Sequence, residues 1–129
     1  MNKILVEVSV GELLDKISIL EIKSEKIKDP EKLNFINDEY KILQGQLNTN
    51  IKNYSEIESL YNSLKEINSK LWVIEDDKRL CEKNSDFGEK FIKLSRDVHF
   101  LNDERAKLKL EINNKTGSKI KEIKEYTKY

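Results

Sequence analysis

The chain has 129 residues, of which 24 are acidic and 24 basic, so its formal net charge is zero. This balance excludes the basic excess expected of a nucleic-acid-binding tail, and the lack of any run of about eighteen apolar residues excludes a membrane-spanning helix. One Pro and four Gly favour long helices over a sandwich or barrel, and the single Cys excludes an internal disulfide or a thiolate metal cluster.

The N-terminal part predicts a short strand followed by a helix. Residues 3–8 alternate in polarity as a short strand does. Ser9 and Glu12 then have the spacing of a capping box, which predicts a helix over residues 10–28. This helix is apolar on two sides, since Ile19 and Ile22 lie opposite its main apolar arc. Such a helix is either sandwiched between neighbouring helices or part of a subunit interface.

Three further helices are predicted from caps and apolar spacing. The first of them starts at Asp29-Pro30, an N-cap followed by a favoured first helical residue. Capping-box spacing marks the next two starts, at Ser55 with Glu58 and at Asp86 with Glu89. Gly117 suits the left-handed end of the last helix. Apolar residues recur about every 3.5 residues, so the helices should pack at shallow angles. Short connections favour antiparallel neighbours. The predicted helices cover residues 30–48, 55–83 and 86–114.

These elements predict an all-α fold, an antiparallel helical bundle that forms one domain over residues 1–129. The tail, residues 118–129, has apolar residues at every third position, which fits neither a helix nor a strand well. We expect a docked tail or a short helix there. The two-sided first helix suggests a homodimer.

Arginine is concentrated in one part of the chain. The three arginines, Arg79, Arg96 and Arg105, all lie in the second half, close to the only Trp (Trp72) and the only His (His99). The planar guanidinium grips a carboxylate or phosphate at two points and tolerates partial burial better than lysine does. This cluster is therefore the first place to look for a specific role.

Arg105 occupies an apolar seam position on its predicted helix, so it needs an anionic partner, because an unpaired buried charge costs several kcal/mol. We expect Glu21 to pair with Arg105 or Arg79, and Glu75 to pair with Arg96. On the third helix Trp72, Glu75 and Arg79 share one stripe, and on the fourth helix His99 and Asn102 share another.

Two interpretations of these residues stay open. In the first, they form structural ion pairs that set the register of the helices. In the second, they converge on a carboxylate or phosphate in an anion pocket. The candidate ligand-binding residues are Arg79, Arg96, Arg105, His99, Trp72, Glu75, Glu21 and Asn102.

Other kinds of site find little support. Glu12 and Asp15 have the three-residue step of the acidic motifs in small helical nucleotide pyrophosphatases, but the order and separation of the acids do not reproduce that pattern. No glycine-rich phosphate loop, zinc spacing or nucleophile elbow is present. Lysines between 107 and 128 are interrupted by glutamates, as on a solvated helix face. We therefore predict no metal, cofactor, nucleic-acid partner or membrane partner.

Three segments resemble an uncharacterised family of short proteins from marine bacteria, cyanobacteria and phages. The segments are residues 8–23 (VSVGELLDKISILEIK), residues 71–79 (LWVIEDDKR) and residues 102–107 (NDERAK). The resemblance spans most of the chain and implies an all-helical domain. It draws attention to Glu21, Glu75, Arg79 and Arg105, and it implies no activity, cofactor or substrate.

The sequence thus predicts a small soluble helical protein, most simply a non-enzymatic structural or protein-interaction module with a buried Arg/Glu network. The alternative is a small helical enzyme or binding protein whose arginine-lined pocket takes a carboxylated or phosphorylated metabolite. A single cysteine and an N-terminus too short and too charged for a signal peptide predict a cytoplasmic location.

Overall fold

The computed structural model describes residues 2–129 and is helical, which confirms the all-α prediction. No residue in that range is in a strand, so the predicted N-terminal strand is wrong: residues 3–9 have no neighbouring strand with which to form backbone hydrogen bonds. None of the helices is both long and apolar enough to cross a membrane, within residues 2–129. The elements in chain order are α1 (Val10–Lys26), α2 (Pro30–Asn50), a 3₁₀ turn η1 (Tyr54–Glu56), α3 (Glu58–Lys83) and α4 (Glu89–Thr116).

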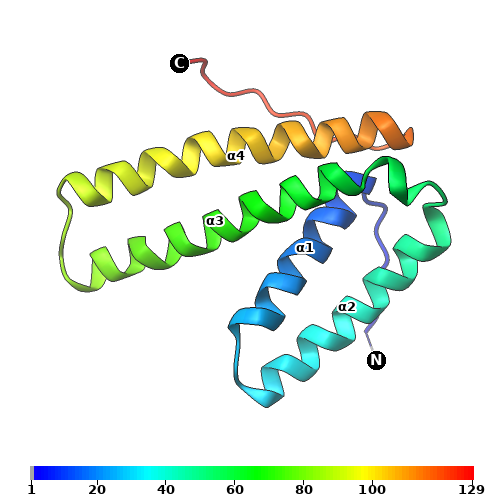
Figure 1. Cartoon of the computed structure of the whole chain (residues 1–129), viewed down its shortest axis with the longest axis horizontal. Coiled ribbons are helices and arrows are strands. Elements are labelled where there is room, and N and C mark those ends of the chain that lie inside the picture. The colour runs from blue at the N-terminus through cyan, green and yellow to red at the C-terminus, as the bar shows by residue number, and fades with distance from the viewer. Residues whose placement is uncertain (1) are drawn as a thin grey trace.

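Two antiparallel hairpins build the fold (Figure 1). The longer hairpin is α3–α4, and α1 of the shorter α1–α2 hairpin crosses one half of it, with α2 on the outer side of α1. We call this covered half, together with α1 and α2, the base. The other half of the long hairpin, residues 73–100, extends beyond the base, and we call it the arm.

The helix starts follow the predicted caps in part. Ser9 Oγ accepts a hydrogen bond from the Glu12 backbone N–H at 3.0 Å, and Asp29 caps α2 with Pro30 as its first residue. The capping box predicted at Ser55 does not form, because residues 54–56 make the 3₁₀ turn and α3 begins after Ile57. Ile57 is buried in the core, so apolar packing decides where this helix starts.

The core lies in the base, where α1 is sandwiched between α2 on one side and α3 and α4 on the other. This arrangement accounts for both apolar sides of α1, and Ile22 on the second side is buried. The apolar pattern of α1 therefore needs no subunit interface to explain it. The central core residues are Leu14, Ile17, Leu47, Ile57, Tyr61, Leu64 and Ile112.

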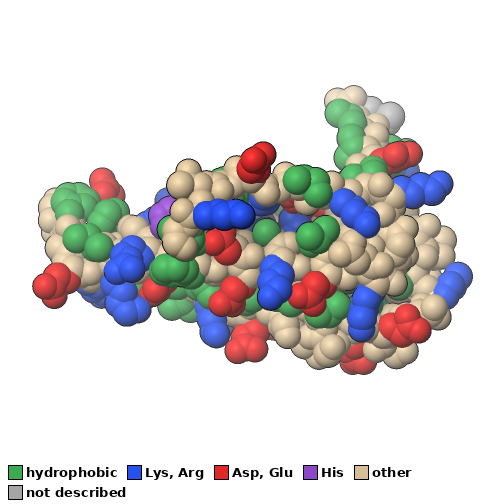
Figure 2. All heavy atoms as spheres, turned by 90° about the horizontal axis from the view of Figure 1, so that it is seen from above, with side chains coloured by type: hydrophobic (Ala, Val, Ile, Leu, Met, Phe, Trp, Pro, Cys, Tyr) green, Lys and Arg blue, Asp and Glu red, His purple; other side chains and the backbone are tan. Residues whose placement is uncertain are grey.

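The arm has a much thinner core, because only two helices contribute to it. Five large hydrophobic side chains on it are each between 45% and 55% exposed. Figure 2 shows hydrophobic side chains gathered at the end of the molecule that carries the α3–α4 connection, with acidic and basic side chains interspersed elsewhere. The five residues are Val73, Leu80, Phe87, Ile92 and Phe100.

The chain leaves α4 through Gly117, whose φ of 66° is in the left-handed region that glycine adopts without strain. The tail, residues 118–129, has no regular secondary structure. Lys109 on α4 binds Glu122 of the tail, and the Tyr129 hydroxyl donates a hydrogen bond to Asp103. The Tyr129 ring also packs edge to face on Phe100, with 5.5 Å between the ring centroids, so the tail is held against α4 by polar and aromatic contacts.

Candidate functional site

A buried carboxylate lies where α1, α3 and α4 meet. Asp15 is only 2% exposed, and the Arg105 guanidinium grips it at two points, with Nε 2.9 Å from Oδ1 and Nη2 2.5 Å from Oδ2. Asn68 on α3 donates to Asp15 Oδ1 at 2.9 Å and to Ser18 Oγ at 2.8 Å. Three helices are therefore joined through one carboxylate.

Lys109 extends this network one turn along α4. Its Nζ lies 2.7 Å from Glu12 Oε2, 3.0 Å from Glu122 Oε2 and 4.0 Å from Asp15 Oδ2. The ammonium therefore joins acids of α1 to an acid of the tail. No cluster of three His, Cys, Asp or Glu side chains suited to a metal ion occurs in the described part of the chain.

The protonation states of the network follow from its hydrogen bonds. Burial by itself would raise the pKa of Asp15, but the hydrogen bonds from Arg105 and Asn68 and the positive charges of Arg105 and Lys109 outweigh it and lower that pKa. Burial likewise opposes the charge of Lys109, yet its bonds to Glu12 and Glu122 raise its pKa. The network is thus held in its charged form.

Gly11 lets α1 approach α4 closely beside this network. Its backbone N–H donates to Asn113 Oδ1 at 2.7 Å, and a Cβ at this position would lie 2.6 Å from the Lys109 carbonyl oxygen. Such a contact is too short for any side chain, so glycine is required here. Gly11, Asp15, Ser18 and Ile22 are all buried and form one stripe on α1, at steps of three and four.

The partner predicted for Arg105 is wrong. Glu21 does not bind an arginine: it accepts a hydrogen bond from the Tyr61 hydroxyl and lies 3.1 Å from Lys65 Nζ. The reason is helical geometry, because each residue turns the helix by about 100° and Glu21 lies on the side of α1 that faces the start of α3. We did not predict Asp15 as the partner of Arg105 from the sequence. The position of Asp15 between Gly11 and Ser18, at helical spacing on one side of α1, could have indicated that it is buried.

A groove opens beside the Asp15–Arg105 pair. It has a volume of about 350 Å³ and lies between the second half of α1 and the middle of α3. Four of the predicted site residues line it: Trp72, Glu75, Arg79 and Arg105. Its remaining lining residues are Ile19, Ile22, Asn68, Leu71 and Asp76.

The other predicted site residues lie elsewhere. Arg96, His99 and Asn102 are exposed on α4 and do not line this groove. The predicted pair between Glu75 and Arg96 is wrong, since no ion pair joins them. These α4 residues project from sides of the helix that α3 does not cover. Helical periodicity puts His99 and Asn102 on one stripe of α4, and the packing leaves that stripe facing outward.

Every buried side-chain nitrogen and oxygen within residues 2–129 has a hydrogen-bond partner in the protein. The hydrogen-bonding groups buried in the Asp15 network are thus satisfied within the protein, and the groove lies beside it.

Comparison with known proteins identifies the family but no activity. The chain matches no curated protein and no solved structure. A family model described as a family of unknown function, DUF6165, matches residues 4–129. With this match over nearly its whole length, the chain belongs to the DUF6165 family of unknown function.

Proposed function

We propose that this protein is a non-enzymatic interaction module that pairs with a second copy of itself through the arm. In this proposal the base holds the α3–α4 hairpin rigidly at one end, and the arm presents an apolar surface to its partner. The Asp15 network supports the rigid base in this proposal. Its hydrogen bonds join α1, α3 and α4 into one unit, and the arm extends from that unit.

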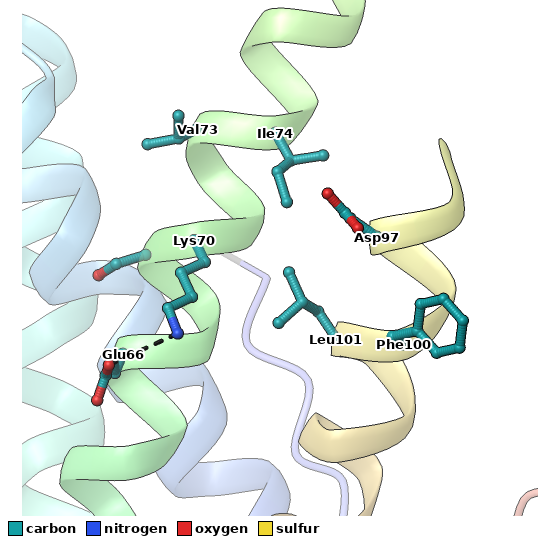
Figure 3. A pocket seen from close by; sticks show the side chains of 8 residues that line it. Glu66, Lys70, Val73, Ile74, Asp97, Phe100 and Leu101 are labelled. Atoms are coloured by element: carbon teal, nitrogen blue, oxygen red, sulfur yellow. Dashed lines mark ion pairs between the residues drawn. The ribbon is translucent and has the colours of Figure 1, made fainter. Parts of the chain in front are cut away.

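The observation that carries the proposal is an apolar groove at the root of the arm, with a volume of about 620 Å³ (Figure 3). Ile74 from α3 and Leu101 from α4 point into the gap between the two helices, and Val73 and Phe100 flank it. Val73 and Phe100 are about half exposed, and Leu80, which is about half exposed too, lies seven residues after Val73 on the same side of α3. Exposed apolar side chains grouped around a groove support the proposal of an interaction site here.

The charges at the rim of this groove favour a second copy over a strongly charged partner. On α3, Lys70 lies 3.6 Å from Glu66, and on α4, Lys93 lies 2.8 Å from Asp97. Each side of the rim is therefore neutral, and it offers no net charge that would attract a basic or acidic partner. A copy of the same face brings an equally neutral rim and an equally apolar centre, as an isologous dimer requires.

Two arms packed face to face would form a four-helix bundle from two helical hairpins. This arrangement would give the arm the second apolar layer that α1 and α2 provide to the base. We expect the dimer to raise the stability of the arm in particular.

Size-exclusion chromatography with light scattering tests the proposal over a range of protein concentrations. The unmodified chain should have the mass of a dimer, whereas the double variant Val73→Asp/Phe100→Asp should have the mass of a monomer. Phe35 on α2 is an exposed hydrophobic residue outside the arm, so Phe35→Asp should remain dimeric. Circular dichroism should show the same helix content in all three proteins.

A monomer mass for the unmodified chain at high micromolar concentration would contradict self-association. A dimer that survives the Val73→Asp/Phe100→Asp change would place the interface outside the arm.

A further inference from the structure

We infer that the groove beside Arg105 binds a small molecule that carries a carboxylate at one end and an ammonium at the other, joined by an apolar chain. Three of its lining residues, Glu75, Asp76 and Arg79, belong to the arm, but the site shares no lining residue with the groove proposed for the dimer and does not depend on dimer formation. Along the groove an arginine is followed by apolar residues and then by two acids, which is the order that such a molecule requires. The Arg105 guanidinium provides the anchor, because Asp15 uses only some of its N–H donors.

Arg105 has donors left over after it binds Asp15. A guanidinium has five N–H donors, and Asp15 takes one from Nε and one from Nη2. Nη1 makes no hydrogen bond to any residue between 2 and 129. The side chain is 30% exposed and lines the groove, so the edge formed by Nη1 and Nη2 is available to a second carboxylate.

Asp15 also fixes the position of this anchor. Binding usually costs rotamer entropy when a long side chain is immobilised, but Arg105 is already held by two hydrogen bonds in the free protein. A carboxylate that approaches the free edge meets a pre-organised, charged donor pair. Asp15 is therefore a positioning residue for the proposed ligand.

The middle of the groove is apolar. Leu71 and Trp72 of α3 line it on one side, and Ile19 and Ile22 of α1 line it on the other. This stretch offers no charged group to a ligand, and it can cover a short aliphatic chain. Trp72 is half-buried, so it is not fully shielded from a ligand in the groove.

Two acids lie farther along α3. Glu75 and Asp76 line the groove seven and eight residues after Asn68, which is beside Arg105, and neither acid is in an ion pair within the described residues. A rise of about 1.5 Å per residue puts them about 10 Å along the helix from Asn68. Helical side chains lean toward the N-terminus of their helix, which shortens the span from these acids to Arg105, so the ammonium of a ligand anchored at Arg105 would find an anionic partner.

The total charge of the groove fits a zwitterion better than an anion. Arg79 also lines the groove, so its lining contains two arginines and two acids. A simple anion would gain from Arg105 but would be repelled by Glu75 and Asp76. The volume of about 350 Å³ is near the lower end of the range for ligand sites, roughly 300–1,000 Å³, which also favours a small ligand.

Fluorescence titration of the full chain tests this site directly, because Trp72 is the only tryptophan. The probe is 6-aminohexanoate, and the comparison ligands are hexanoate, which lacks the ammonium, hexylamine, which lacks the carboxylate, and 4-aminobutanoate, which is shorter. We expect 6-aminohexanoate to change Trp72 emission saturably and to bind about tenfold more tightly than each of the other three.

A matched pair of variants locates the ammonium end. Glu75→Gln/Asp76→Asn removes the two acids of the groove and should weaken 6-aminohexanoate binding about tenfold, with little change for hexanoate. Asp38→Asn/Glu39→Gln removes two adjacent exposed acids on α2 and should leave binding unchanged. Neither variant touches the Asp15–Arg105 pair, so both should fold.

The inference is overturned if 6-aminohexanoate gives no saturable change up to about 10 mM, a limit that corresponds to very weak binding. It is also overturned if hexanoate or hexylamine binds equally well, or if both double variants weaken binding equally. The dimer proposal is tested separately, since Val73→Asp/Phe100→Asp should bind 6-aminohexanoate as the unmodified chain does.

Discussion

Within residues 2–129, ion pairs that join different helices occur in the base and not in the arm. In the base, the main ion pair joins Asp15 to Arg105, which are 90 positions apart in the sequence, and Lys109 bridges acids from α1 and the tail. In the arm, Lys93 pairs with Asp97 four residues away on the same helix. Cross-helix pairs fix how helices are placed relative to one another, whereas pairs within one helix support only that helix and leave its surface free.

The two regions differ in apolar packing for a related reason. Helix α1 covers the base half of the α3–α4 hairpin, so hydrophobic residues there are buried. The arm lacks this cover and exposes residues of the same type. The two halves of this one hairpin therefore differ: the half in the base has a covered, well-packed interior, and the half in the arm leaves large apolar side chains exposed.

The largest effect should come from removing the carboxylate at the centre of the base. Asp15→Ala leaves Arg105 without its partner, and breaking a buried pair in this way should lower the free energy of unfolding by about 3–5 kcal/mol. Asp97→Ala, the matched change in the arm, removes an exposed pair and should cost about 0.2–1 kcal/mol. Urea denaturation of both variants measures the difference.

The double variant Asp15→Leu/Arg105→Met sharpens this test, since replacing a whole buried pair by apolar residues is often nearly neutral. Its stability should exceed that of Asp15→Ala. If Asp15→Ala and Asp97→Ala lose equal stability, the contrast between base and arm is wrong.

A smaller effect is expected at the α1–α4 contact. Gly11→Ala puts a Cβ 2.6 Å from the Lys109 carbonyl oxygen, so the helices must separate, and overpacking of this kind costs about 1–3 kcal/mol. Gly45→Ala in α2 meets nothing within 4 Å and should stabilise the protein by about 0.5–1 kcal/mol, because Ala is the better helix former. Thermal unfolding should therefore move in opposite directions for the two changes, and equal shifts would contradict the close approach at Gly11.

The smallest expected effect is the dependence of stability on pH. The folded-state pKa of Asp15 is lowered, so its stabilising contribution is complete above its unfolded pKa of about 3.9 and is lost as the pH falls toward the folded pKa. Asp15→Asn cannot titrate, so the stability difference between it and the unmodified chain should shrink below about pH 3.9. Urea midpoints measured between pH 7 and pH 3 check this, and a difference that stays constant would show that Asp15 is not ionised in the folded protein.

Much of the fold could be predicted from local patterns. Helical spacing predicted the all-α class, Asp29-Pro30 marked the start of α2, and Gly117 marked the end of α4. The seam position of Arg105 also showed that this residue needs an anionic partner. These features depend on residues within a few positions of one another, and that is the range over which helix propensity, capping and periodicity act.

The tertiary structure alone decided which helices and which faces meet. It selected Asp15 over Glu21 as the partner of Arg105, packed α1 against three helices, and left Arg96, His99 and Asn102 facing outward. One residue of difference turns a side chain by about 100° around its helix, so small differences in crossing geometry change every contact between distant segments. A sequence states which residues need partners, and the packing of the helices determines which partners they find.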